Sequence, residues 1–257
     1  MTEAGTGAPS APSMGLVEKL TGIFFSPAKV FAAVAGKPGW DWIVPLVFLA
    51  VCVLTYQGIL QKRFDKEAAI SETMAKIEAN PRIPADQKAG IEERVRGQFE
   101  WGEKPIGKVI SVLTMLIPVF VVPLLYKGIS AAFGLKAGYM KLVAGYAWCM
   151  VVTGLYWLLG GVVALPRSDI PLFEMQHMLV LKSNPAAFMG QASSVALVTM
   201  LSFVDVFVIW GLFLRATMLE KVAGFGKGAS WAVAGTVLGL WILIRAALAA
   251  LGQMFGG

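Results

Sequence analysis

Asp205, Arg215 and Arg245 are ionisable residues inside long apolar stretches, where a charged side chain could do chemistry. A charge within a lipid bilayer costs about 3 kcal/mol or more unless it finds a partner or water, so each of the three requires an explanation. Asp205 and Arg215 lie about 15 Å apart along a helix and not on one face, so they cannot pair with each other. We expect Arg215 to extend toward the membrane rim, near Lys221.

Arg245 is better placed to meet the acid. If the helices that carry Asp205 and Arg245 turn near Val222 and run antiparallel, the two residues lie within about 9 Å of the same level. We therefore predict an Asp205–Arg245 contact, direct or through water. Two classes of function could use it. One is an ion pair that fixes helix packing in a non-enzymatic scaffold, and the other is a polar path in a small transporter, channel or lipid-moving protein.

No arrangement of residues typical of an enzyme is present in the sequence. It contains no His-Glu-x-x-His, no Gly-x-Ser-x-Gly and no glycine-rich phosphate loop, and Asp205 has no second acid within an apolar stretch. His177 is the single histidine, and Cys52 and Cys149 lie far apart without neighbours at metal-ligand spacing. We expect no catalytic residue, no metal and no cofactor.

The composition indicates a membrane protein. The chain of 257 residues is 57% hydrophobic and 15% charged, with a mean hydropathy of +0.69, whereas soluble domains contain about 25% charged residues. The formal charge of +6 does not predict nucleic-acid binding, because the bases flank apolar runs and do not form one patch. Anionic lipid head groups are the expected neighbours of these bases, and the lipid bilayer is the first expected partner.

Uncharged runs of about 18 residues or more predict an all-α, polytopic fold with five transmembrane helices. The runs cover 42–61, 109–126, 142–166, 183–204 and 228–244. Asn184-Pro185 is a good helix start, so the fourth helix could extend from Pro185 to Met218. In the fifth run, Gly235 and Gly239 are four residues apart, a spacing that allows another helix to approach closely.

Residues 62–104 form the one long polar segment. It holds nine Lys or Arg and nine Asp or Glu, and apolar residues recur at helical spacing on both sides of Asn80-Pro81-Arg82-Ile83-Pro84. The two prolines require a turn between two helices. We expect an extramembrane helical hairpin between spans one and two, with a solvated charged face or a docking surface for another protein.

The amino-terminal part divides into two segments ahead of a membrane domain over 40–257. Residues 1–13 are rich in Gly, Ala, Pro and Ser, which predicts a disordered tail and not a signal peptide. Residues 14–39 carry apolar side chains at near-helical spacing and predict two amphipathic helices on the membrane surface. Ser26-Pro27 marks the restart, with proline at the first position of the second helix.

The distribution of bases predicts the orientation. Short connections on the amino-terminal side of the membrane carry nine Lys or Arg, and those on the other side carry two, with the hairpin left out of the count. The positive-inside rule places the amino terminus in the cytoplasm and, with five spans, the carboxyl terminus outside.

Short motifs near the spans resemble the bacterial branch of the Yip family, five-span membrane proteins named for binding Ypt/Rab GTPases in eukaryotes. Four features carry the resemblance: Phe25-Ser26-Pro27 with Phe31, Trp40-x-x-x-x-Pro45, Gly145-Tyr146, and Asp205-x-Phe207-x-x-Trp210. The turn at residues 80–84 adds to it. The resemblance covers nearly the whole chain after residue 14.

The resemblance implies a non-enzymatic membrane-organising protein of a bacterial inner membrane, with a cytosolic amino terminus. Eukaryotic members act in vesicle traffic, membrane shaping and recruitment of prenylated GTPases. The Asp-Leu-Tyr-Gly-Pro stretch of those members is absent here and the amino-terminal part is short, so Rab-type GTPase binding is not implied. Expected partners are the bilayer, a second copy of the chain and other membrane proteins.

Overall fold

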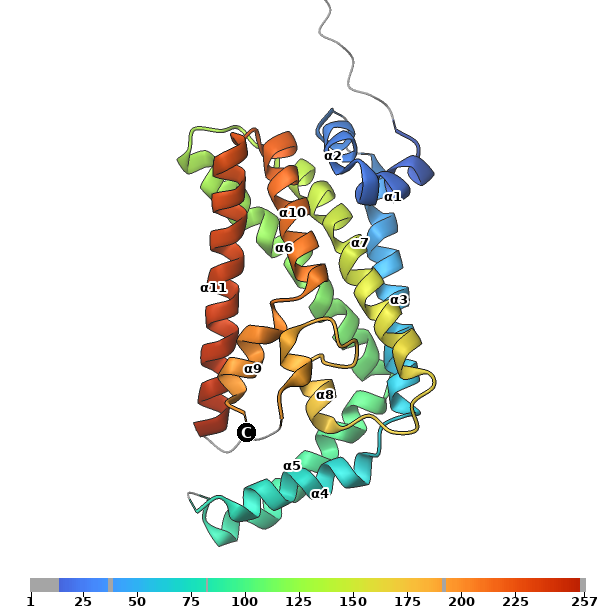
Figure 1. Ribbon diagram of the computed structural model, residues 1–257, viewed down its shortest axis with the longest axis vertical. Helices are drawn as coiled ribbons and strands as arrows, with labels where there is room; N and C mark the ends of the chain where they lie inside the picture. Colours follow the sequence, from blue (N-terminus) through green and yellow to red (C-terminus); the bar gives the residue numbers. More distant parts are fainter. Residues whose placement is uncertain (1–13, 37–38, 82, 191–192, 255–257) are drawn as a thin grey trace, which may run out of the picture. The chain divides into compact units, whose positions relative to one another are not determined.

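The computed structural model describes residues 14–36, 39–81, 83–190 and 193–254, and within these ranges every regular element is a helix. The predicted tail at 1–13 lies outside the described residues. In chain order the elements are α1 (Leu16–Phe25), α2 (Pro27–Gly36), η1 (Trp40–Trp42), α3 (Ile43–Gln61), α4 (Lys66–Ala79), α5 (Ala85–Glu103), α6 (Pro105–Ala132), α7 (Tyr139–Ala164), α8 (Leu172–Gln176), η2 (Pro185–Phe188), α9 (Val195–Ser202), α10 (Val206–Met218), η3 (Leu219–Ala223) and α11 (Lys227–Met254) (Figure 1).

Four helices of the described chain are long and apolar enough to cross a membrane unbroken. They cover Trp40–Gln61, Pro105–Ala132, Tyr139–Ala164 and Lys227–Gly252. A fifth candidate is a bent pair, Val195–Ser202 and Val206–Ala223, whose axes meet at 55°. The all-α, polytopic membrane fold predicted from the sequence is confirmed.

The fourth predicted helix differs from the structure. The sequence allowed one helix from Pro185 to Met218, but the structure has three shorter pieces, η2, α9 and α10. Asn184 does start a helix, because Pro185 is the first residue of η2, yet η2 ends after four residues. A uniformly apolar composition carries no information about where such a segment breaks.

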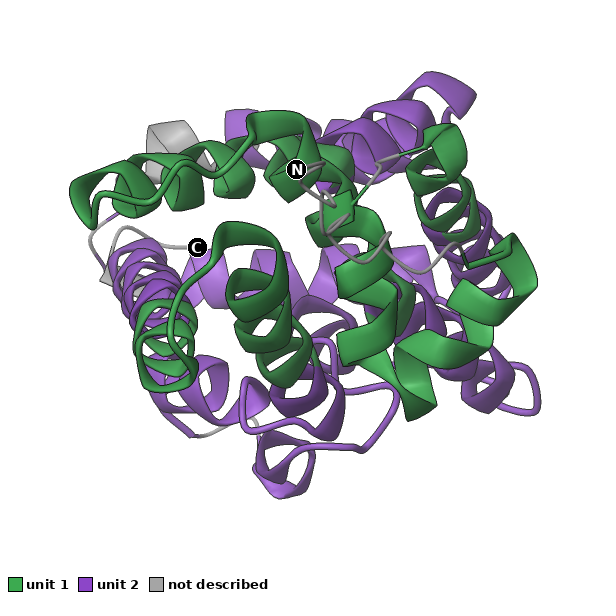
Figure 2. Cartoon of the chain, turned by 90° about the horizontal axis from the view of Figure 1, so that it is seen from above, with its two compact units in different colours: residues 1–48, 116–152, 211–235 green, residues 49–115, 153–210, 236–257 purple. Residues whose placement is uncertain are grey.

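The chain divides into two compact units, which Figure 2 shows in green and purple. The first unit comprises residues 1–48, 116–152 and 211–235. Its core contains side chains without exposed surface, including Phe31 on α2, Trp148 on α7 and Leu214 on α10. α2 begins at Pro27, directly after Ser26, as the sequence predicted.

The second unit comprises residues 49–115, 153–210 and 236–257. Gly160 and Gly161 allow α7 to approach α3 closely. A Cβ atom at Gly160 would lie 3.2 Å from the Tyr56 ring, and one at Gly161 would lie 3.2 Å from Ile59 Cδ1. The rings of Tyr56 and Trp157 also pack, with centroids 4.8 Å apart. Small residues beside aromatic ones thus bring two membrane helices together.

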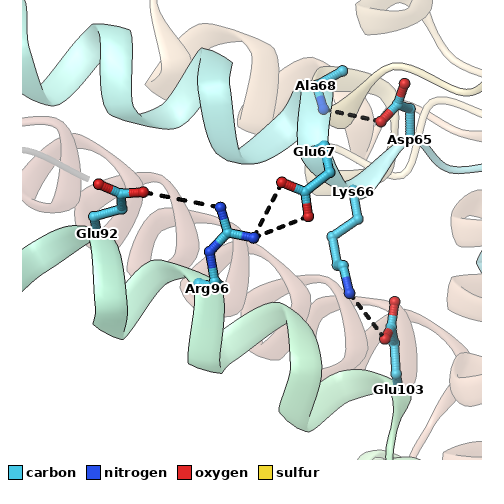
Figure 3. A network of polar contacts seen from close by, with 7 residues as sticks. All are labelled: Asp65, Lys66, Glu67, Ala68, Glu92, Arg96 and Glu103. Atoms are coloured by element: carbon cyan, nitrogen blue, oxygen red, sulfur yellow. Dashed lines mark hydrogen bonds and ion pairs between the residues drawn. The ribbon is translucent and has the colours of Figure 1, made fainter.

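The polar segment 62–104 folds into two helices, α4 and α5, which lie side by side (Figure 1). Figure 3 shows the ion pairs that join them. The Arg96 Nη1 atom lies 3.0 and 3.1 Å from the two carboxylate oxygens of Glu67, and the Lys66 Nζ atom lies 3.3 Å from Glu103 Oε2. In the hairpin, each of the two helices thus contributes one acid and one base to the ion pairs that join them.

Candidate functional site

Asp205 lies directly before α10 and caps its amino-terminal end. Its Oδ1 atom accepts a hydrogen bond of 2.7 Å from the Phe207 backbone N–H, and its carbonyl oxygen accepts one of 2.9 Å from the Ile209 N–H. The first N–H groups of a helix have no partner within the helix, and Asp is among the residues that satisfy them best. The acid therefore begins a new helix and does not interrupt an existing one.

Two side chains from the connection before η2 complete the partners of this carboxyl group. The Ser183 hydroxyl donates a hydrogen bond to Asp205 Oδ2, and Asn184 Nδ2 lies 3.4 Å from the same oxygen. Asp205 is 2% exposed and Asn184 is 4% exposed. We call Asp205, Ser183 and Asn184 the Asp205 cluster. Both carboxyl oxygens are used within it, so the cluster joins a connecting segment to the start of α10.

Aromatic contacts surround the first turn of α10. The Phe207 ring lies 5.6 Å from the Tyr156 ring of α7, measured between centroids. The Tyr156 hydroxyl donates a hydrogen bond of 2.6 Å to the Met178 carbonyl oxygen. Tyr156 therefore ties the connection after α8 to the helix that Asp205 caps.

The predicted Asp205–Arg245 contact is not found as a direct ion pair. Arg245 is exposed on α11, and among the described residues no ion pair joins it to Asp205. The prediction assumed a continuous helix that would carry the acid into the bilayer without local partners. Because the helix starts at Asp205, a backbone N–H and two neighbouring side chains satisfy the acid first.

Arg215 forms a hydrogen bond within its own helix. Its Nε–H donates a hydrogen bond of 2.9 Å to the Gly211 carbonyl oxygen, one turn earlier on α10, and its guanidinium interacts with the Tyr146 hydroxyl. Lys221 pairs instead with Glu220, with the Nζ and Oε1 atoms 2.7 Å apart. Helical side chains lean toward the amino-terminal end, and glycine leaves its carbonyl oxygen accessible, so Arg215 turns away from Lys221.

The remaining candidates hold no metal site in the part of the chain that the structure describes. Cys52 and Cys149 are buried free thiols. His177 follows α8, and its ring packs on Phe173 with centroids 4.8 Å apart. Burial lowers the pKa of His177, which favours the neutral imidazole.

Sequence reasoning missed one ion pair in the connection after α7. Arg167 Nη2 lies 3.1 Å from Glu174 Oε1, and a second hydrogen bond joins Arg167 Nη1 to the other carboxylate oxygen. This hydrogen bonding raises the pKa of Arg167. The two residues are separated by an irregular segment, where no helical spacing could have indicated the contact.

The residues of the recognised motifs lie at points where elements join. Gly145 packs against α10, since a Cβ atom there would lie 2.8 Å from Met218 Cγ. Tyr146 follows it in the core, 4% exposed. In the motif Asp205-x-Phe207-x-x-Trp210, Asp205 supplies the cap and Phe207 the capped N–H, while Trp210 is half-buried on the next turn. The motif is therefore the start of a helix.

The predicted packing at Gly235 and Gly239 is not found among the residues that the structure describes. A Cβ atom at either position would meet no described atom within 4 Å. Glycines at close helix contacts among the described residues include Gly22, Gly145, Gly160 and Gly161. A four-residue glycine spacing is common in membrane helices and does not by itself identify the face that packs.

The chain was compared with known protein families, curated proteins and solved structures. The comparisons with curated proteins and with solved structures gave no significant match. The family model of the Yip1 domain matches residues 21–251, which include α2, the Asp205 cluster and the candidate spans except for Gly252 at the end of the last one. The chain is therefore an integral membrane protein that belongs to the Yip1 domain family.

Proposed function

We propose that this protein is a non-enzymatic scaffold that organises the membrane by binding lipid or other proteins through its amino-terminal helices. The observation that carries the proposal is that buried apolar side chains anchor α1 and α2 while α1 exposes other apolar side chains. Ile23, Val30 and Phe31 are completely buried, whereas Val17 is 73% exposed and Phe25 is 87% exposed. A segment fixed by one apolar face and presenting a second one outward is suited to contact with a lipid surface or a membrane partner.

The ion pair between Lys19 and Asp41 supports this role. Lys19 lies on α1, its side chain is 8% exposed, and its Nζ atom contacts the Asp41 carboxylate in η1. The pair joins the amphipathic start to the entry of the first span. The exposed side chains of α1 are thus held in a fixed place relative to η1 in the same unit.

The Asp205 cluster supports a scaffold over a transporter. An acid that carries an ion or a proton must exchange partners during each cycle. Both oxygens of Asp205 are instead engaged by Ser183, Asn184 and the backbone of Phe207. The cluster acts in our proposal as a packing device.

Asp205→Asn provides a test because asparagine caps helices about as well as aspartate. We expect liposomes with the wild-type protein or this variant to match empty liposomes in proton flux, potassium flux and scrambling of a fluorescent phospholipid. A flux in the wild-type liposomes that Asp205→Asn abolishes would overturn the scaffold proposal in favour of transport.

Photocrosslinking in native membranes tests the contact itself. A photoreactive residue at Val17 or Phe25 should crosslink to lipid or to a membrane protein, and one at the buried position Phe31 should not. Equal crosslinking at all three positions would contradict the proposal.

We further propose that the protein lies in a bacterial cytoplasmic membrane with its amino terminus in the cytoplasm. Reporter fusions at both termini would check this orientation.

A further inference from the structure

Arg215 is a half-buried cation on a candidate membrane span, and it lacks an ion pair with any described residue. Its Nε–H is used by the Gly211 carbonyl oxygen at 2.9 Å. The guanidinium has four further N–H groups, on Nη1 and Nη2, which form the fork that binds two oxygens of one anion. An uncompensated arginine in a bilayer draws anions and water toward itself.

Two tyrosine hydroxyls lie in the field of this guanidinium. Arg215 acts electrostatically on Tyr126 of α6 and on Tyr146 of α7, and the two rings pack with centroids 6.4 Å apart. Tyr126 has no exposed surface, and its hydroxyl has no hydrogen-bond partner among the described residues. A buried hydroxyl without a partner is costly, so the Tyr126 hydroxyl is available to donate to a group that is not part of the chain.

The charges nearby in the chain are almost all positive. Segments 116–152 and 211–235 of the first unit contain six Lys or Arg and one acid, Glu220, which is paired with Lys221 at 2.7 Å. Arg215 lies about 12 Å along the helix from Ala223, where η3 ends. Bases at the ends of these helices attract anions from the adjacent membrane surface.

We infer that Arg215, Tyr126 and Tyr146 form a binding site for a phosphate-bearing anion. A phosphate offers several oxygens in the arrangement that a guanidinium fork and phenolic hydroxyls can donate to together. Either a phospholipid head group or a free phosphate supplies this chemistry. Gly211 is a positioning residue, because a Cβ atom there would lie 3.3 Å from Arg215 Nη2 and would displace the guanidinium. The inference does not depend on the scaffold role.

The test uses the full-length protein purified in mild detergent and compares four forms. They are the wild type, Arg215→Gln, Tyr126→Phe and the control Arg245→Gln, which changes an exposed arginine. Native mass spectrometry measures retention of phosphatidylglycerol against diacylglycerol, which has no phosphate. Thermal unfolding measures stabilisation by inorganic phosphate against chloride.

We expect Arg215→Gln to lower binding of the phosphate-bearing probe about tenfold and Tyr126→Phe to lower it about fivefold, with Arg245→Gln unchanged. Loss of phosphatidylglycerol retention identifies a lipid site, and loss of stabilisation by inorganic phosphate identifies a soluble anion. If Arg215→Gln does not fold, the nearly isosteric Tyr126→Phe decides. Two outcomes would overturn the inference. In the first, the wild type and Tyr126→Phe bind each of the two probes equally well. In the second, the wild type binds neither probe.

Discussion

Replacing Asp205 separates its role as a helix cap from any role of its charge. Asp205→Ala removes the acceptor of the Phe207 N–H and the acceptor shared by Ser183 and Asn184. Losing an N-cap costs about 1 kcal/mol. Leaving a buried donor without a partner costs about 1–3 kcal/mol more, because Asp205 is 2% exposed and water does not replace it freely. We expect a total destabilisation of about 2–4 kcal/mol.

Asp205→Asn should cost only about 1 kcal/mol, since the amide oxygen can accept from the Phe207 N–H and the amide NH₂ can donate to Ser183 Oγ, so that only the long 3.4 Å hydrogen bond from Asn184 Nδ2 loses its acceptor. Equilibrium unfolding in mixed detergent micelles, followed by circular dichroism, measures both variants. Amide hydrogen exchange at Phe207 provides a local readout, because Asp205→Ala alone should accelerate it. Arg245→Ala is the control, with an expected change within about 0.5 kcal/mol.

Two results would refute this reasoning. If Asp205→Asn destabilises the protein as much as Asp205→Ala, the negative charge matters and the cap geometry does not. If Asp205→Ala changes the free energy of unfolding by less than about 0.5 kcal/mol, the Asp205 cluster does not hold the start of α10.

Three further predictions concern other parts of the chain. Gly145→Ala should lower the stability of the protein by about 1–3 kcal/mol through overpacking, because the new Cβ would lie 2.8 Å from Met218 Cγ. Met218→Ala should relieve most of this cost, which thermal unfolding of the double variant measures against Met218→Ala alone. Asp41→Asn should destabilise α1 more than Lys19→Met does, because Asp41→Asn leaves the Lys19 ammonium, whose side chain is 8% exposed, without its partner. Hydrogen exchange in α1 measures both variants, and the reverse order would contradict this prediction. The lowered pKa of His177 means that the unfolded chain binds its proton more tightly, so stability should fall as the pH drops below about 6.5, and His177→Gln should remove that part of the pH dependence.

The sequence predicted the class of the fold but not the ends of the helices. Counting uncharged residues placed the second span at 109–126, whereas α6 extends over Pro105–Ala132 and includes Lys108 and Lys127. Lysine is a good helix former, and its long side chain can reach the membrane surface, so a charge does not end a helix. Composition detects what can sit in lipid, while helix ends depend on caps and turns.

The Asp205 cluster could have been predicted only in part. Aspartate is a preferred N-cap, so one acid in an apolar run could have indicated a helix start as well as a buried charge. Ser183 and Asn184, however, precede it by a long segment that contains η2 and α9, and no periodicity relates them. Their contact depends on the tertiary path of the chain. The electrostatic influence of Arg215 on Tyr126 and Tyr146 depends in the same way on the packing of α10 against helices that precede it by many residues.

The position of the break also bears on how the bent pair of helices crosses the bilayer. At 1.5 Å per residue, Val206–Ala223 is about 27 Å long, close to the roughly 30 Å thickness of a hydrocarbon core, whereas Val195–Ser202 is about 12 Å and cannot cross alone. A crossing made by Val206–Ala223 begins one residue after Asp205. The acid then lies at the end of a span, where Ser183 and Asn184 of a connecting segment reach it. An acid in that place needs no ion pathway to account for it, and Arg215, nine residues into the crossing, is the charge in this span that still requires a partner.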